Sequence, residues 1–178
     1  AFADYGQYLD SLEMTAAIKG FEPLYIQRIA QLTNKSNQFN LTTLRCSEDD
    51  IRAMAGDKND LCLCGKLVDK FGDNGIVTVV AGRQQGDVLD LTLWLMSCRV
   101  LKRGMEDAMM DTVVAEAAAR GVKTIVGHYY PTAKNAMVRK FYAQYDFAKT
   151  AEDADGNTEW TLDVAAYTPK HPHMKIER

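Results

Sequence analysis

The chain has 178 residues, of which 47% are hydrophobic and 25% are charged, a size and composition typical of one globular domain with its own core. Its net charge of −3 lacks the basic excess of nucleic-acid-binding proteins. No apolar run approaches the ~18 residues of a membrane span, and no secretory signal is visible. We therefore expect a cytoplasmic protein without nucleic-acid or membrane partners.

The two ends of the chain differ from its middle. Apolar residues at positions 2, 5, 9 and 12 have helical spacing, so residues 1–13 are interpreted as the remnant of a preceding helix or linker. The first residue is Ala1 rather than Met, which we interpret as the cut end of a longer protein. Residues 167–178 contain two prolines and scattered charges and are predicted to form a loose tail. Residues 14–166 are then the domain.

A polar segment follows the first predicted strand, residues 14–18, and a predicted helix. This segment, residues 34–43, includes the apolar Phe39 and Leu41. Its candidate pocket residues are Asn37, Gln38, Asn40 and Thr42. Two explanations stay open: a ligand in a cleft satisfies these polar groups, or the backbone of an irregular loop does. In either case we expect the loop to border a ligand pocket.

Three strands are predicted in the middle of the chain. Residues 61–68 and 76–81 are expected to pair as a hairpin, because glycine and asparagine supply turn residues between them. The next strand, residues 88–96, is almost wholly apolar, which predicts a central place in the sheet. Its leucines, at positions 89, 91, 93 and 95, are expected to share one face.

A helical pattern over residues 104–120 separates the strand 88–96 from another at residues 124–129. Strand, helix, strand is a βαβ unit, so these two strands are predicted to be parallel with a right-handed crossover, and to splay apart near Ser97. A further helix at residues 135–145 and a closing hairpin complete the pattern. The expected fold is mixed α/β, with a mostly antiparallel sheet and one parallel, splayed strand pair.

Three cations, Arg99, Lys102 and Arg103, precede the N-terminus of the central helix. That end of a helix carries a partial positive charge from the backbone dipole, so cations are misplaced there unless an anion binds. Free backbone N–H groups and these side chains can together cradle a phosphate, and Gly104 lets it approach closely. The alternative is a solvated loop whose charges have no ligand.

The stretch from Arg99 to Gly104 resembles the R/Q-x-x-G-x-G/A loop of GNAT acyltransferases, with Lys102 in place of the first glycine. The resemblance implies the GNAT (acyl-CoA N-acyltransferase) fold and a loop that grips the pyrophosphate of acyl-CoA. It assigns the following residues to CoA or phosphopantetheine: Ser97, Arg99, Lys102, Arg103, Gly104 and Asn135.

A second motif of the same family is resembled by Asn135, Val138, Phe141, Tyr142 and Phe147, which match N-x-x-A-x-x-F-Y-x-x-x-G-F in part. In that family the asparagine lies near the pantetheine arm, and the tyrosine protonates the leaving thiolate. A phenol of pKa near 10 suits this role beside a thiol of pKa ~8.5. The glycine of the motif is Asp146 here. The alternative is that Tyr142 only packs with Phe141.

Residues 31–43, QLTNKSNQFNLTT, are similar to the QLTNKTNQFNLTT stretch of FkbH-like proteins, and residues 71–77, 96–100 and 130–135 resemble the same family. The resemblance implies the C-terminal GNAT-like domain of a protein whose partner is an N-terminal HAD-type domain. The D-x-D-x-T motif of a HAD domain is absent from this sequence. Such proteins load glyceryl or related acyl groups onto acyl carrier protein in polyketide-type biosynthesis.

Three further residues are candidates for chemistry. Cys98 adjoins Arg99 and a helix N-terminus, which favours a thiolate and a transient acyl-thioester; the alternative is a buried free thiol, as expected for the other cysteines. Asp90 interrupts an apolar strand and is either a general base or a buried hydrogen-bonding group. His128 is placed in the substrate pocket, although a lone histidine is more often structural. Cysteine spacing fits no zinc site, and no metal is expected.

Two functions follow from these observations. The first is an acyltransferase-like domain that binds acyl-CoA or acyl carrier protein through the pantetheine arm, with Tyr142, Cys98 and Asp90 as its candidate catalytic residues. The second is a non-catalytic module that docks the carrier protein or binds substrate for a separate HAD-type domain. A clear general base would favour the first function.

Overall fold

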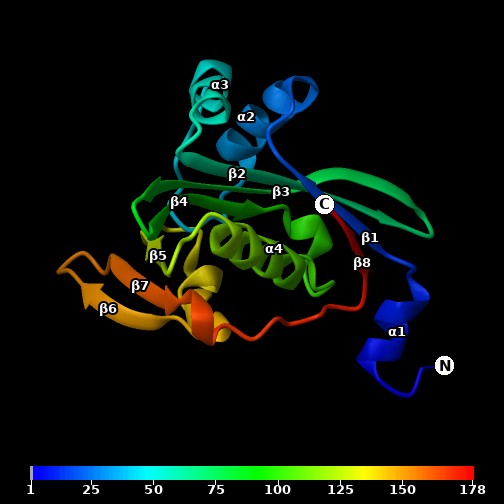
Figure 1. Ribbon diagram of the computed structural model, residues 1–178. Coiled ribbons are helices and arrows are strands. Elements are labelled where there is room, and N and C mark those ends of the chain that lie inside the picture. The colour runs from blue at the N-terminus through cyan, green and yellow to red at the C-terminus, as the bar shows by residue number, and fades with distance from the viewer. Residues whose placement is uncertain (1) are drawn as a thin grey trace.

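The computed structural model describes residues 2–178, which fold around one mixed β-sheet (Figure 1). Its eight strands are β1 (Thr15–Lys19), β2 (Asp60–Asp69), β3 (Gly72–Gln85), β4 (Val88–Met96), β5 (Thr124–Tyr129), β6 (Ala148–Glu152), β7 (Thr158–Asp163) and β8 (Lys175–Glu177). They lie in the order β6-β7-β5-β4-β3-β2-β1-β8. Every neighbouring pair is antiparallel except β4–β5 and β1–β8, which are parallel.

Helices cover both faces of this sheet. Helices α2 (Ile26–Lys35) and α3 (Glu48–Gly56) lie on one face and α4 (Met105–Ala119) on the other, while α1 (Tyr5–Ser11) precedes β1 (Figure 1). A capping box between Ser47 and Asp50 begins α3. Within residues 2–178, no helix has the length and hydropathy needed to cross a membrane.

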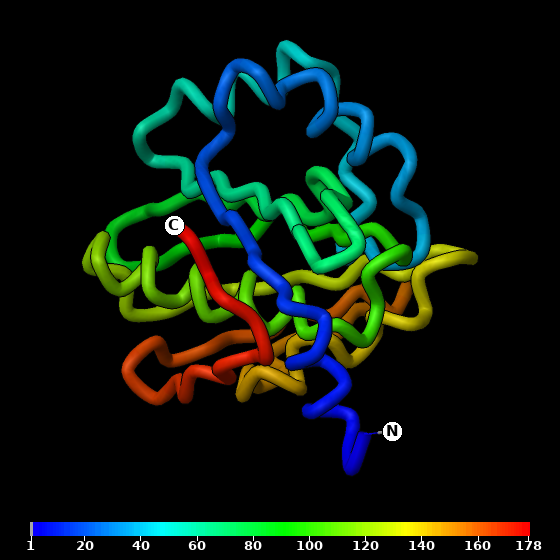
Figure 2. Tube along the Cα trace, turned by 90° about the vertical axis from the view of Figure 1, so that its right-hand side faces the viewer, coloured from blue at the N-terminus to red at the C-terminus, as the bar shows by residue number. Residues whose placement is uncertain are grey.

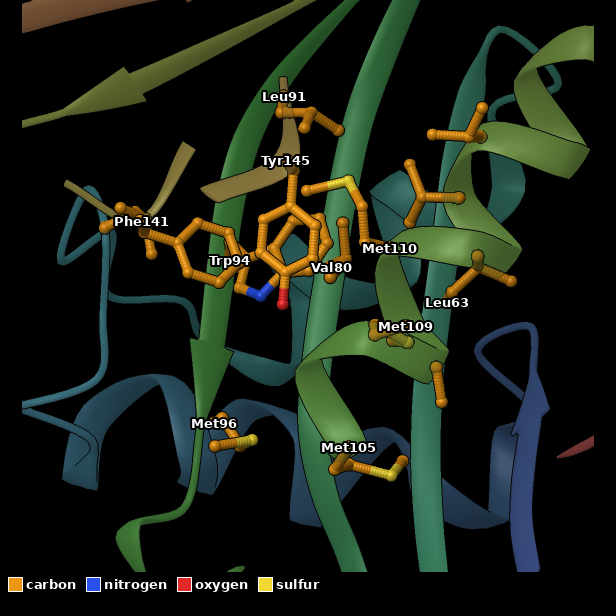
Figure 3. Close-up of a cluster of buried hydrophobic side chains, with 14 of the residues drawn as sticks. Leu63, Val80, Leu91, Trp94, Met96, Met105, Met109, Met110, Phe141 and Tyr145 are labelled. Atoms are coloured by element: carbon orange, nitrogen blue, oxygen red, sulfur yellow. The ribbon is translucent and has the colours of Figure 1, made fainter. Parts of the chain in front are cut away.

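The alternation of side chains between the two faces of the sheet is reversed partway along β4. Thr92 has no partner in β3, whereas its neighbours on both sides are paired, so it forms a β-bulge. Leu91 and Trp94 both point toward α4 (Figure 3), while Leu93 belongs to the cluster under α2 and α3. The expectation that the leucines share one face is therefore wrong, because one extra residue reverses the alternation beyond it.

Strands β4 and β5 run parallel and then diverge, as expected. Their paired residues are Val88 with Thr124, Leu89 with Ile125 and Asp90 with Val126. Beyond Asp90 the two strands separate, although β4 continues to Met96 and β5 to Tyr129. Helix α4 connects them across one face of the sheet (Figure 1).

The segment predicted as a helix over residues 135–145 is irregular. It contains two short 3₁₀ turns, Ala136–Val138 and Tyr142–Tyr145, rather than a continuous α-helix. The aromatic rings at positions 141, 142 and 145 are all buried in the cluster beneath α4. Tertiary packing of these rings, rather than helical propensity, sets the backbone here.

The C-terminal segment is held against the domain, so the expectation of a loose tail is wrong. Its last strand, β8, pairs with β1, and Figure 2 shows the red C-terminal stretch beside the blue β1. The buried carboxylate of Asp111 accepts hydrogen bonds from the Tyr167 hydroxyl (2.6 Å), Lys170 N (2.9 Å) and His171 N (3.0 Å). These long-range contacts leave no periodic pattern in the sequence of the tail.

Candidate functional site

The gap between β4 and β5 is filled by the chain itself. Residues 39–41, called the inserted segment below, lie antiparallel to the end of β4. Leu41 N donates to the Trp94 carbonyl (3.0 Å), and Met96 N donates to the first carbonyl of the segment (3.0 Å). On the other side, Tyr130 N donates to the Leu41 carbonyl (2.9 Å). The inserted segment thus serves as a short extra strand between the diverging strands.

The fully buried side chain of Asn135 holds the inserted segment in place. Its Nδ2 donates to the Asn40 carbonyl (2.9 Å) and to the Tyr130 carbonyl (2.9 Å), and its Oδ1 accepts from Thr132 N (2.8 Å). Both amide hydrogens of this predicted cofactor-binding residue are therefore used within the chain.

The polar residues around the inserted segment are largely satisfied by the protein. Asn40 Nδ2 donates to the Ser36 carbonyl (3.0 Å), and Asn40 Oδ1 accepts from Thr43 N (2.9 Å). Thr42 Oγ1 donates to the Thr92 carbonyl (2.8 Å). For Asn40 and Thr42 the backbone of an irregular loop is thus the explanation that the structure supports.

Two cavities flank the inserted segment. The cationic cavity, of about 530 Å³, lies beyond the end of β4, and its lining includes Arg28, Lys35, Asn37, Gln38, Cys98 and Lys134. The dyad cavity, of about 280 Å³, is lined by Thr42, Leu44, Asp90, Thr92, His128 and Tyr130. Phe39 lines the first cavity and Thr42 the second. Seven of the predicted site residues line these cavities, and the others line neither: Asn37, Gln38, Ser97 and Cys98 line the first, and Thr42, Asp90 and His128 line the second.

Asp90 and His128 form a hydrogen-bonded pair in the dyad cavity. His128 Nε2 lies 2.5 Å from Asp90 Oδ1. The side chain of His128 is 18% exposed and that of Asp90 is 51% exposed. Asp90 belongs to the last paired position of β4 and β5, and His128 comes two residues after its partner on the same face. A carboxylate bonded to one imidazole nitrogen orients the ring. The pair has the composition of a general base.

Tyr142 lies on the face of β5 opposite to the one that carries His128. Its ring covers Gly127, where an added Cβ would lie 2.4 Å from the ring, so only glycine fits at that position. His128, the next residue, points to the other face. Burial raises the pKa of Tyr142, and the charge of Asp90 adds to the rise. The phenol therefore keeps its proton. It and the Asp90–His128 pair lie on opposite faces of β5.

The predicted phosphate loop is tied to the protein by its own side chains. Arg103 Nη1 forms an ion pair with the buried carboxylate of Asp69 (2.8 Å), and Arg99 Nη2 donates to the Asn74 carbonyl (3.3 Å). Lys102 has φ of +63°, the left-handed conformation that favours the glycine it replaces. The loop thus keeps a glycine-type backbone, while Arg103 already has an anionic partner.

The N-terminus of α4 is covered by distant parts of the chain. The Tyr5 hydroxyl donates to the Lys102 carbonyl, and an added Cβ on Gly104 would lie 3.2 Å from Pro172. Glu106, in the first turn of α4, has a pKa raised by burial. CoA, which the sequence resemblance implies, could reach this loop only after these covering segments had moved aside. Arg99 and Lys102 remain exposed, whereas the inserted segment occupies the gap beside β4.

Cys98 is exposed at the rim of the cationic cavity, whereas Cys46 and Cys64 are buried. Its Sγ donates to Gln38 Oε1 (3.3 Å). The explanation of Cys98 as a packed thiol is therefore wrong, because the residue lies in the turn that follows β4. Sequence reasoning missed Arg28, Lys35 and Lys134, which line the same cavity as this thiol.

Comparisons with known proteins give matches of structure only: no family model and no curated protein sequence matches the chain. The ribosomal-protein-S18-alanine N-acetyltransferase of Escherichia coli superposes with a TM-score of 0.63 at 14% identity, over 84% of this chain and 94% of that chain. The chain has the GNAT acetyltransferase fold. The expected fold is thereby confirmed.

Two further solved structures share the GNAT fold. The GNAT domain of S. lividans PAT matches with a TM-score of 0.62 at 15% identity, over 82% of this chain and 89% of that chain. Spermidine N-acetyltransferase of Vibrio cholerae, solved with CoA and spermine, matches with a TM-score of 0.62 at 9% identity, over 84% and 96% of the two chains. Similarity at these identities shows the fold, and function is argued from the site.

Proposed function

We propose that the chain is an acyltransferase-like domain in which the Asp90–His128 pair is the general base for an acyl acceptor in the dyad cavity. The 2.5 Å contact between these two side chains, at the point where β4 and β5 diverge, is the observation that supports it. Neutral imidazole accepts the proton of the acceptor, and the carboxylate stabilises the imidazolium that forms.

Tyr142 is proposed as the proton donor of the same reaction. The role is supported by its place in the N-x-x-A-x-x-F-Y-x-x-x-G-F motif, which this sequence resembles. The phenol is protonated at rest, although burial, which raises its pKa, makes it a weaker acid. The acid and the base would then stand on opposite faces of the sheet, on either side of the strand gap.

The proposed acyl donor is a thioester of phosphopantetheine, carried by CoA or by an acyl carrier protein. The GNAT fold and the glycine-type backbone at Lys102 support this choice. The inserted segment and the cover over α4 have to move before such a donor can lie beside β4. The similarity to FkbH-like proteins extends the proposal to a glyceryl-like acyl group, carrier-protein loading in polyketide-type biosynthesis and a HAD-type partner domain.

Single-turnover acyl transfer tests the assignment of the base. His128→Gln keeps a polar side chain of similar size but removes the titrating imidazole. Transfer from acetyl-CoA to a phosphopantetheinylated carrier protein should fall by about 10²–10⁴-fold, with donor binding nearly unchanged. Tyr142→Phe should show the same pattern. His171→Gln, a change in the exposed part of the tail, is the matched control and should retain the wild-type rate. Equal rates for His128→Gln and wild type would defeat the proposal.

A second candidate function is favoured by the inserted segment. The inserted segment already fills the gap between β4 and β5, where an acyl donor would lie. The domain would then serve as a non-catalytic module that docks a carrier protein. In that case the carrier binds, and neither His128→Gln nor Tyr142→Phe changes acylation of the carrier by a full-length protein.

A further inference from the structure

The cationic cavity gathers positive charge from parts of the chain that are distant in sequence. Arg28 and Lys35 come from α2 and its C-terminal end, and Lys134 comes from the loop that follows β5. Among the residues that the structure describes, no aspartate or glutamate lines the cavity. The chain as a whole carries a net charge of −3, so the positive charge at this cavity has the opposite sign to the net charge of the chain.

These three cations have no acidic partner within residues 2–178. None of them takes part in the ion pairs that the described residues form. Arg28 Nη1 donates to Gln31 Oε1 (2.9 Å), which is neutral. Like charges around a concave surface repel one another, and the low-dielectric walls focus their field into the hollow. An anion in the cavity would relieve this repulsion.

The rest of the lining is apolar or neutral and is held in place. Leu32, Phe39 and Met96 supply buried apolar side chains. At the rim, Arg45 Nη1 donates to the Ser36 carbonyl (2.9 Å), and Arg45 Nη2 donates to Asn37 Oδ1 (2.5 Å). The cavity therefore joins an apolar wall to a rim that carries Arg28, Lys35 and Lys134. This combination suits a ligand with a short hydrocarbon part and an anionic group.

We propose that the cationic cavity binds a small anion that carries a short apolar group, as a carboxylate or a phosphate monoester. This inference extends the proposed function by naming the class of ligand that the cationic cavity binds. It rests on the proposed function only where it treats that ligand as a substrate of the same domain. Binding itself depends on Arg28, Lys35 and Lys134 and requires neither the Asp90–His128 pair nor a CoA molecule.

Alkylation of Cys98 reports the field inside the cavity directly. Iodoacetate is an anion and iodoacetamide is its neutral analogue, so the ratio of their rates at Cys98 cancels changes in the thiol itself. Lys35→Gln and Lys134→Gln should each lower the iodoacetate-to-iodoacetamide ratio by about threefold to tenfold. Lys58→Gln, an exposed lysine outside the cavity, should leave it unchanged. Peptide mass spectrometry assigns the reaction to Cys98, and Cys98→Ser removes the signal.

Protection of Cys98 from iodoacetamide then tests the ligand class. Butyl phosphate and butyrate share a hydrocarbon part with n-butanol, which is neutral. We expect one or both anions to protect Cys98 from iodoacetamide. At equal concentration n-butanol should protect it at least about tenfold less well. The anion that protects Cys98 more strongly identifies phosphate or carboxylate as the preferred group. Protection should weaken in Lys35→Gln and Lys134→Gln but persist in His128→Gln.

Two results would overturn the inference: an alkylation ratio that is equal in all lysine variants, or protection that is equal for n-butanol and the anions or absent for all three. Failure of acyl transfer, by contrast, would defeat the proposed function without changing either measurement. The two proposals can therefore be judged separately.

Discussion

Glu106 shows how burial sets the state of a single carboxyl group. It lies in the first turn of α4, where the helix dipole favours negative charge, yet burial raises its pKa. Its Oε2 is buried without a hydrogen-bond partner among residues 2–178. The loss of hydration therefore exceeds the stabilisation that the helix end provides.

Replacing Glu106 should make stability less dependent on pH. A carboxyl whose pKa is raised on folding contributes stability below its unfolded pKa, and this contribution is lost as pH rises through its folded pKa. Glu106→Gln is neutral at every pH, so it should stabilise the protein at pH 7 by about 1 kcal/mol more than at pH 4. Urea unfolding at the two pH values measures the difference. Glu116→Gln, later in the same helix, is the control, and an identical pH response in both variants would contradict the explanation.

The inserted segment acts as a secondary-structure element although it is only three residues long. Its backbone bonds to β4 on one side and to Tyr130 on the other, and Asn135 anchors its middle. Such bonds replace the β4–β5 ladder that ends at Asp90, so the strand edges in the gap do not remain unpaired.

Hydrogen exchange should show whether a donor replaces the inserted segment. The amide of Leu41 donates to the Trp94 carbonyl inside the gap, so it should exchange slowly in the free protein. If acyl-CoA or a phosphopantetheine carrier enters beside β4, exchange at Leu41 should accelerate by about tenfold or more, because that bond is broken. The amide of Val79 in β3, away from the gap, serves as the reference. A ligand that binds while Leu41 stays protected would place the donor elsewhere.

At the scale of the whole molecule, the two ends of the chain close the structure around α4 and β1. Leu9 and Leu12 are buried in the same cluster as α4, and β8 extends the sheet beyond β1. The tail also supplies the hydrogen bonds to Asp111, which is only 8% exposed. Residues 167–178 are therefore proposed as a structural part of the domain.

Ending the chain after residue 166 should cost about 3–5 kcal/mol of unfolding free energy, because it removes the hydrogen bonds that the tail donates to the Asp111 carboxylate. The same truncation in an Asp111→Asn background should cost less, since the hydrogen bonds that it removes are then made to a neutral amide rather than to a charged carboxylate. Chemical denaturation of the four proteins forms the test. A truncation cost that is equal in both backgrounds would exclude Asp111 as the anchor.

Much of the fold could be inferred from local patterns in the sequence. The βαβ unit around residues 104–120, the hairpins and the positions of the cations before α4 follow from periodicity and turn residues, which act between neighbours in the chain. The parallel pair that diverges is confirmed for the same reason. The face exchange at Thr92 was not predicted, because a bulge depends on pairing with β3.

The candidate site depends on contacts between distant residues, and only the tertiary structure brings them together. Asp90 and His128 were separate candidates 38 residues apart until the parallel pairing of β4 and β5 placed them 2.5 Å from each other. Arg28, Lys35 and Lys134 gather at one cavity only because α2 and the loop after β5 meet at the end of β4. Residue types and local spacing determine which chemistry is possible, whereas the closing of long loops decides which groups act on the same ligand.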